Sequence, residues 1–134
     1  MTTPLSLIAR KAELTGLRNA LDAGGGKAKF YTNGPPATPD TATAETLLGT
    51  IVLATTSGEI GASETLATLT LTVPQVASAV VTGIIGFVRL TNGAGDGFMD
   101  LAVGLAGSGG PVIVNALQVY AGGELQLISC VIAK

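Results

Sequence analysis

The pattern of hydrophobic and polar positions divides the chain into an N-terminal helix and a strand-rich remainder. Leucines recur at positions 7, 14 and 21, with Leu17 and Ile8 beside them, and this spacing is typical of the apolar stripe of an amphipathic helix. Thr3-Pro4 is expected to open the helix, with the threonine as cap and the proline at the first helical position. Gly24-Gly25-Gly26 is expected to end it near Asp22–Ala23 and to act as a hinge.

From residue 27 onward the pattern is that of strands. Leucine and threonine alternate clearly over 66–73, glycine-rich turns at 91–97 and 121–123 indicate two hairpins, and residues 55–64 are expected to be a polar loop. The predicted strands are Lys27–Thr32, Leu47–Leu53, Leu66–Val73, Ile84–Leu90, Phe98–Val103, Val112–Val119 and Leu125–Ile132. We therefore predict a mainly β fold: an antiparallel β-sandwich or jelly-roll-like domain of about seven strands, preceded by one N-terminal amphipathic helix.

These elements predict two structural parts within a length that suits one domain. Residues 1–23 are expected to form a helical arm, and residues 24–134 a single β-sandwich domain. Between the first two strands lies a long loop, 33–46, rich in proline and threonine. Pro35, Pro36 and Pro39 cannot donate to a β-ladder, so this loop is expected to stay outside the sheet in an extended shape.

Composition adds that the surface is unusually poor in charge. Only 12% of the 134 residues are charged, whereas 47% are hydrophobic. A soluble monomer normally carries more charge on its surface, and large apolar surface usually marks an interface. We expect partners to cover much of this surface; an unusually neutral monomer is the alternative.

The few charges are unevenly distributed along the chain. Residues 1–30 carry five basic and two acidic side chains, a net +3, whereas residues 31–134 carry two basic and seven acidic ones, a net −5. The N-terminal part is therefore either an arm that docks on an acidic surface or an ordinary solvated helix face. Nucleic acid is a poor candidate partner, because the basic residues are too few to neutralise many phosphates.

Two long uncharged runs, 65–88 and 101–123, are each long enough to cross a bilayer. Both are interrupted by turn-forming residues: the first by Pro74 and two glycines, the second by Gly107-Ser-Gly-Gly-Pro111. Each run therefore indicates strand–turn–strand, and no membrane insertion is expected.

The sequence offers little chemistry. It has no histidine and a single cysteine, Cys130, which excludes the usual zinc sites and an internal disulfide and argues against enzymatic function. Cys130 lies in an apolar strand and is expected to be a small buried hydrophobe. Asp96 and Asp100 could together approach a calcium ion, or they could be a turn aspartate and a strand-edge aspartate. We predict no catalytic residues, no metal and no cofactor.

Several segments together resemble small virion proteins of tailed bacteriophages. The resemblance covers residues 5–132 loosely, through a helix that ends in a DAG-G hinge, a strand and turn of the type K-x-Y-T-G-x-P, a P-D-T loop and an aromatic-hydrophobic-Arg strand. The matching stretches are Leu21–Gly26, Lys29–Gly34, Pro36–Ala42, Leu47–Leu53, Gly86–Leu90 and Val119–Leu125. The chain departs from the pattern at Tyr31–Gly34, where its turn is one residue longer, and at 74–83, which is less polar.

The resemblance implies a capsid cement or decoration protein on the outside of an HK97-type head shell. Its partners would be the major capsid protein and further copies of itself, as a homodimer or homotrimer, after synthesis in the cytoplasm of the host bacterium. The implied partner-binding residues lie on the helix and in the loop: Leu7, Arg10, Lys11, Leu14, Leu17, Arg18, Leu21, Pro35, Pro36 and Pro39. Removal of residues 1–22 is expected to leave the β-fold intact. A glycan-binding jelly roll and another tail or neck component of the virion are the alternatives.

Overall fold

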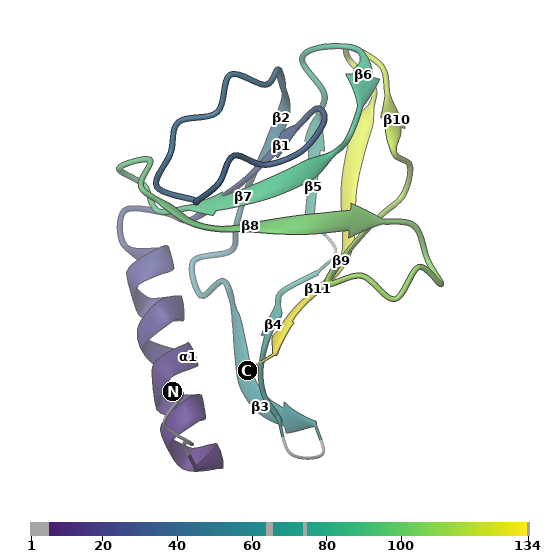
Figure 1. The fold of residues 1–134 in the computed structure, drawn as a ribbon. Coiled ribbons are helices and arrows are strands. Elements are labelled where there is room, and N and C mark those ends of the chain that lie inside the picture. The colour runs from purple at the N-terminus through teal and green to yellow at the C-terminus, as the bar shows by residue number, and fades with distance from the viewer. Residues whose placement is uncertain (1–5, 64–65, 74, 134) are drawn as a thin grey trace.

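One helix is followed by eleven strands in the part of the chain that the computed structural model describes, residues 6–63, 66–73 and 75–133 (Figure 1). The helix, α1, spans Leu7–Asp22. The strands are β1 (Lys27–Tyr31), β2 (Leu47–Val52), β3 (Gly58–Ser63), β4 (Leu66–Leu71), β5 (Gln75–Ser78), β6 (Gly83–Ile84), β7 (Phe87–Thr91), β8 (Gly97–Gly104), β9 (Val112–Val114), β10 (Gln118–Val119) and β11 (Glu124–Ala133). The predicted class, mainly β with one N-terminal helix, is confirmed.

The strands form one long curled sheet and a short separate ribbon. In the long sheet the order is β2-β1-β7-β8-β9-β11-β4-β3, and β5 also pairs with β11. The ribbon consists of β6 and β10. Among the described strands every pairing is antiparallel except that of β8 with β9, which run parallel over a short stretch.

The ten-residue strand β11 connects several parts of the curled sheet. The start of β11 pairs with β5 and its last three residues pair with β4, so β5 and β4 lie one after the other along the same edge. Beyond β5, the Val80 N–H donates to the Leu48 carbonyl of β2 at 2.8 Å. This bond joins the two ends of the curled body, while α1, β3 and β4 extend from it (Figure 1).

Apolar side chains fill the inside of the curled sheet. β7 is buried at all five positions, because β1 and β8 flank it and both of its faces are covered. On the inner face Val88 and Leu90 lie opposite Phe30 and Ala28 of β1. The largest fully buried side chains are Phe30, Phe87, Leu21, Leu48, Ile51, Leu69, Leu71, Leu90, Leu125, Leu127, Val88 and Val112.

The described part of α1 begins and ends with clear local signals. Thr3 and Pro4, the predicted start, lie outside the described residues; the helix is capped by Ser6, whose hydroxyl accepts from the Ala9 N–H at 3.1 Å. The helix ends at Asp22, as predicted. Gly24 and Gly25 follow at φ +73° and +94°, a region that favours glycine.

The glycine run after α1 is a fixed turn in this structure rather than a free joint. The Gly93 N–H, in the turn between β7 and β8, donates to the Ala23 carbonyl at 3.0 Å. A Cβ on Gly93 would collide with the Gly24 carbonyl, so two glycines allow the backbones to touch. A second bond fixes the end of the helix, where the Asp22 carboxylate accepts from the Ser57 N–H, just before β3, at 3.2 Å.

The apolar stripe of α1 packs on the protein's own β-strands, chiefly β4 and β3. Leu14 and Leu21 are 2% and 1% exposed and belong to the core, and Leu7 and Leu17 pack against it. Ile8 is 81% exposed, so its assignment to the stripe was wrong. Since the helix completes the core, the expectation that residues 1–22 can be removed without affecting the β-fold conflicts with the structure.

Four sequence-based strand assignments need correction. The predicted polar loop 55–64 contains β3, which pairs in continuous register with β4 although its two glycines lower its strand propensity. The short strand β5 was not predicted. The predicted strand Ile84–Leu90 is divided at Gly86, where a Cβ would strike the Asn33 backbone. The predicted strand Val112–Val119 is divided at Asn115, whose side-chain oxygen accepts from the Gln126 N–H at 3.0 Å.

Replacement of a buried leucine of α1 should destabilise the whole protein. We expect Leu14→Ala to lower the free energy of unfolding by about 2–5 kcal/mol, because it leaves a cavity between the helix and the sheet. Ile8→Ala, on the same helix but exposed, should change it by less than about 0.5 kcal/mol. Urea denaturation followed by circular dichroism measures both values. Equal small effects would show that α1 is not part of the core.

Candidate interaction surfaces

The proline- and threonine-rich loop 33–46 is fastened to the outer face of the sheet by Arg89 of β7. The guanidinium donates to both carboxylate oxygens of Asp100 on β8, at 2.7 and 2.9 Å, and to the Thr41 carbonyl of the loop at 2.7 Å. The side chains of Arg89 and Asp100 are 8% and 6% exposed. On the same face Tyr31 stacks on Phe87 with ring centroids 5.3 Å apart. The loop therefore covers the sheet instead of projecting from it.

The base of the loop is closed by a second set of hydrogen bonds. The Glu45 carboxylate accepts from the Asn33 amide at 2.7 Å and from the Thr32 hydroxyl at 3.2 Å. Of the prolines predicted to bind a partner, Pro35 is exposed, whereas Pro36 and Pro39 are half-buried. A Cβ on Gly97 would collide with the Pro39 carbonyl, so the loop also packs on the start of β8.

The electrostatics of this site are those of a structural ion pair. The hydrogen bond to Asp100 raises the pKa of Arg89 above its ordinary value, and the Asp100 charge acts in the same direction. Arg89 therefore stays charged inside the protein. Asp96 has a different partner, since one of its carboxylate oxygens accepts from the Asn92 side-chain amide at 3.1 Å. The two aspartates weighed as a calcium pair thus each have a separate structural role.

Sequence reasoning missed this ion pair, although a signal was present. Arg89 stands between Val88 and Leu90, and Asp100 stands between Met99 and Leu101. One cation and one anion, each in the middle of an apolar strand and joined by a single hairpin, face each other in the register of β7 and β8. Burial of either charge alone would be costly, so such a pattern predicts a buried pair.

The predicted basic residues of α1 differ in their surroundings. Arg18 donates to the Gly58 carbonyl of β3 at 3.4 Å and to the Asn19 side chain at 3.5 Å. Arg10 donates from its Nε atom to the Ser6 carbonyl at 3.5 Å. Arg10 and Lys11 are half-exposed. Arg18 thus contacts β3, whereas Arg10 contacts the start of its own helix.

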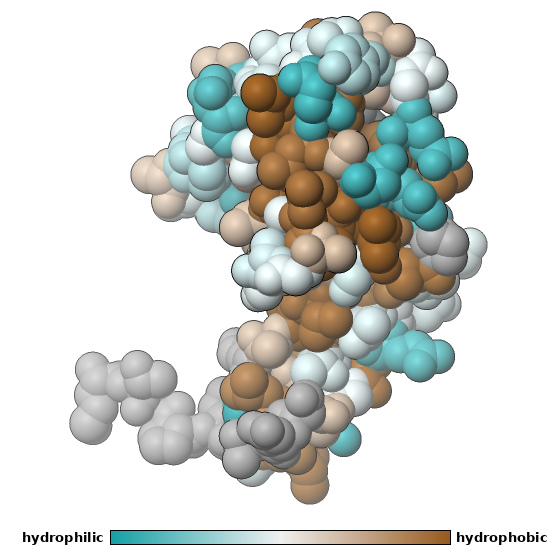
Figure 2. Space-filling view, turned by 90° about the vertical axis from the view of Figure 1, so that its right-hand side faces the viewer, coloured by the Kyte–Doolittle hydropathy of each residue, from teal (hydrophilic) through white to brown (hydrophobic). Residues whose placement is uncertain are grey.

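Large hydrophobic side chains are exposed in many places on the described surface. Figure 2 shows hydrophobic residues in a broad band over the side that carries β10 and the segment after β8. Exposed large hydrophobic residues are Ile8, Val52, Leu66, Val73, Val76, Val80, Val81, Ile84, Leu105, Tyr120 and Ile128. Exposed apolar residues that occur singly are common, but a contiguous band such as the one in Figure 2 is typical of sites that bind other molecules.

The described parts of the two uncharged runs meet in the structure. β6 from the first run pairs with β10 from the second, and the Ile85 N–H donates to the Leu117 carbonyl at 2.9 Å. Residues 79–86 and 115–123 form a charge-free end of the body, which we call the apolar tip. Its exposed members include Val80, Ile84 and Tyr120.

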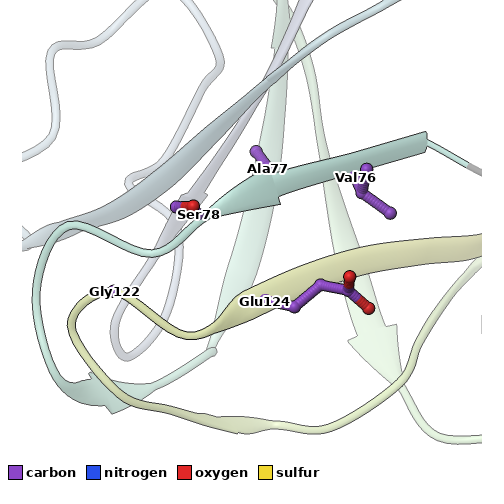
Figure 3. Close-up of a pocket in the computed structure, with 5 residues that line it drawn as sticks. All are labelled: Val76, Ala77, Ser78, Gly122 and Glu124. Atoms are coloured by element: carbon purple, nitrogen blue, oxygen red, sulfur yellow. The ribbon is translucent and has the colours of Figure 1, made fainter.

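Neither of the two described pockets has the features of a small-molecule site. One, of about 240 Å³, lies beside the apolar tip; Figure 3 shows Val76, Ala77 and Ser78 of β5 with Gly122 and Glu124 around it. Glu124 is its one charged side chain, whereas ligand sites are usually larger and combine several convergent polar groups. The other, of about 370 Å³, lies between the loop and the β7–β8 turn, and its charged lining residues are Asp40, Arg89 and Asp96. Arg89 already binds Asp100 and Thr41, and Asp96 accepts from Asn92.

The described residues contain no group of three or more His, Cys, Asp or Glu side chains that could hold a metal ion. In the same part of the chain, no helix has the length and apolar character needed to cross a membrane. No protein-family model, curated protein or solved structure matches this chain.

Cys130 is buried, as predicted, and should be chemically inert in the folded protein. Burial raises the pKa of its thiol to about 12, so at pH 8 only about one molecule in ten thousand carries the reactive thiolate. We expect a thiol reagent such as dithionitrobenzoate to react slowly with the native protein and rapidly in urea. Rapid reaction of the native protein at pH 8 would contradict the buried position.

Disruption of the Arg89–Asp100 pair should destabilise the fold and release the loop. We expect Arg89→Met to lower the free energy of unfolding by about 3–5 kcal/mol, because Asp100 is left buried without a counter-charge. Hydrogen exchange should accelerate in residues 33–46. Lys29→Met removes a half-exposed cation opposite Arg89 on β1 and should cost less than about 0.5 kcal/mol. Unchanged exchange in the loop of the Arg89 variant would contradict the fastening role.

Proposed function

We propose that this chain is a structural virion protein that binds the outer surface of a tailed-bacteriophage head and cements neighbouring capsomers. Its partner on the shell is the major capsid protein. The chain is made in the cytoplasm of the host bacterium and ends on the exterior of the capsid. It stabilises the head against the pressure of the packaged DNA through binding alone.

The observation that carries this proposal is the exposed apolar surface of a body with so few charges. A protein that works by covering its surface with other subunits needs such side chains, since burial of apolar area contributes about 25 cal/mol per Å². Repetition of a modest contact over a shell multiplies its effect. The resemblance of residues 5–132 to small phage virion proteins supports the same proposal.

The structure changes which residues we assign to the shell contact. The predicted leucines of α1 are occupied by the protein's own core, and the loop is fastened to β7 and β8. We assign the shell contact to the half-exposed Arg10 and Lys11 and to the exposed Pro35 at the edge of the loop. Arg10 and Lys11 suit an acidic patch on the shell.

One structural observation argues against the glycan-binding alternative. Glycan sites usually present several exposed aromatic rings, but Tyr31 stacks on Phe87 and Phe30 is fully buried. Among the described residues Tyr120 is the one aromatic side chain that is largely exposed. A tail or neck component remains an alternative that copy number distinguishes from a cement protein.

The copy number in purified particles tests the proposal directly. Quantitative mass spectrometry of phage particles from the source of this sequence should find the chain in numbers comparable to the major capsid protein. A cement protein occupies repeated sites over the whole shell, whereas a neck or tip component occupies few. A far lower number, or the absence of the chain from particles, would contradict the proposal.

Binding to undecorated heads tests the assigned contact in the same system. The double variant Arg10→Glu, Lys11→Glu should weaken binding by about tenfold, which corresponds to about 1.4 kcal/mol, and should reduce its dependence on salt. Glu124→Lys, an exposed charge change on β11, should bind as the wild type does. If the wild-type chain binds but the helix variant is unaffected, the function stands and this contact is wrong.

A further inference from the structure

The apolar tip, residues 79–86 and 115–123, combines high exposure with an ordered backbone. Val80, Ile84 and Tyr120 are 65%, 61% and 65% exposed, and Val81 is 39% exposed. They lie on two segments far apart in the sequence that the β6–β10 pairing brings together. Neither segment contains an Asp, Glu, Lys or Arg residue.

A network of backbone hydrogen bonds holds the tip in one shape. The Ala79 N–H donates to the Gly123 carbonyl and the Gly122 N–H to the Ala79 carbonyl, both at 2.8 Å. The Ala121 N–H donates to the Thr82 hydroxyl at 3.0 Å, and the Val80 N–H donates to the Leu48 carbonyl of β2. Because the backbone is already ordered, a partner that covers these side chains would not have to fold the tip first.

The absence of charge favours a second copy of this chain as the occupant. In a two-fold contact each residue near the axis meets its own copy, so any charge there would face an equal charge. The tip has no charged residue and so avoids this repulsion. The nearest acidic residue in the sequence, Glu124, follows the tip directly and lines the neighbouring pocket with Val76 and Gly122. An acidic shell surface would call for basic residues, and so would the usual amphipathic contact with a lipid surface; the tip has none.

The share of the chain that the tip makes up can be compared with the share of surface that a stable contact takes. A stable two-protein interface takes about 800 Å² from each partner, roughly 12% of the 6910 Å² accessible surface of the chain. The tip contains 17 of the 134 residues, and three of these, Ala79, Ile85 and Val119, are buried. Val76 of β5, 56% exposed, adjoins the tip and extends the apolar surface.

We infer that the apolar tip is the interface of a two-fold symmetric dimer of this chain. Val80, Ile84 and Tyr120 of one copy pack against the same residues of the other. The contact forms in the free protein, so it goes beyond the proposed binding to phage heads and does not depend on it. The tip does not include α1, so Arg10 and Lys11 lie outside this contact.

Sedimentation equilibrium of the full chain over a range of concentrations tests the inference. The wild type should have twice the chain mass of 13.3 kDa. Ile84→Glu places two like charges at the axis and should raise the dimer dissociation constant by about tenfold or more. Val52→Glu, at a position 63% exposed on β2, is the matched control and should remain dimeric. An equimolar mixture of Ile84→Glu and Ile84→Lys should restore the dimer.

Circular dichroism and thermal unfolding establish that each variant is folded, and Tyr120→Glu replaces Ile84→Glu if that variant is not. A wild-type monomer, a trimer, or a dimer unaffected by a folded tip variant would overturn the inference. A monomer that sediments with phosphatidylcholine vesicles would identify a lipid surface as the occupant instead. A monomer that binds heads would leave the proposed function intact, and a dimer that does not bind them would leave this inference intact.

Discussion

The buried charge of Arg89 is the constraint on which the arrangement of the body depends. β7 is covered on both faces, so a guanidinium placed there has little access to water. It is stable only because β8 supplies the Asp100 carboxylate and the loop supplies the Thr41 carbonyl. The loop between β1 and β2 is thereby held over the outer face of the sheet. The surfaces that we propose for partners are Arg10 and Lys11 on α1, Pro35 in the loop, and the apolar tip.

Periodicity and turn chemistry predicted the elements whose signals are local. The end of α1 at Asp22, the alternating strand β4 and the hairpin of β7 and β8 follow from apolar spacing and glycine-rich turns. β3 could not be predicted in this way, because its sequence contains two glycines and its stability comes from pairing with β4. The breaks at Gly86 and Asn115 likewise depend on contacts with residues distant in the sequence.

The candidate surfaces were less predictable than the fold, because exposure is a property of the whole molecule. The sequence indicated that α1 has an apolar stripe, but not that its own sheet covers Leu14 and Leu21 completely. It also contains two runs without charge, and each of them predicts strand–turn–strand. The structure shows that the pairing of β6 with β10 joins these runs at one end of the body, where Val80, Ile84 and Tyr120 are exposed.

The central place of β11 has a consequence for the order of folding. This strand pairs with β4, β5 and β9, and all three precede it in the chain. During synthesis the earlier strands therefore leave the ribosome before the strand that joins them exists. The hairpins β3–β4 and β7–β8 can form early because their contacts are local, but the curled sheet can close only once residues 124–133 have emerged. Until that moment several apolar strand edges stay open, and a nascent chain of this protein is most exposed to aggregation just before β11 arrives.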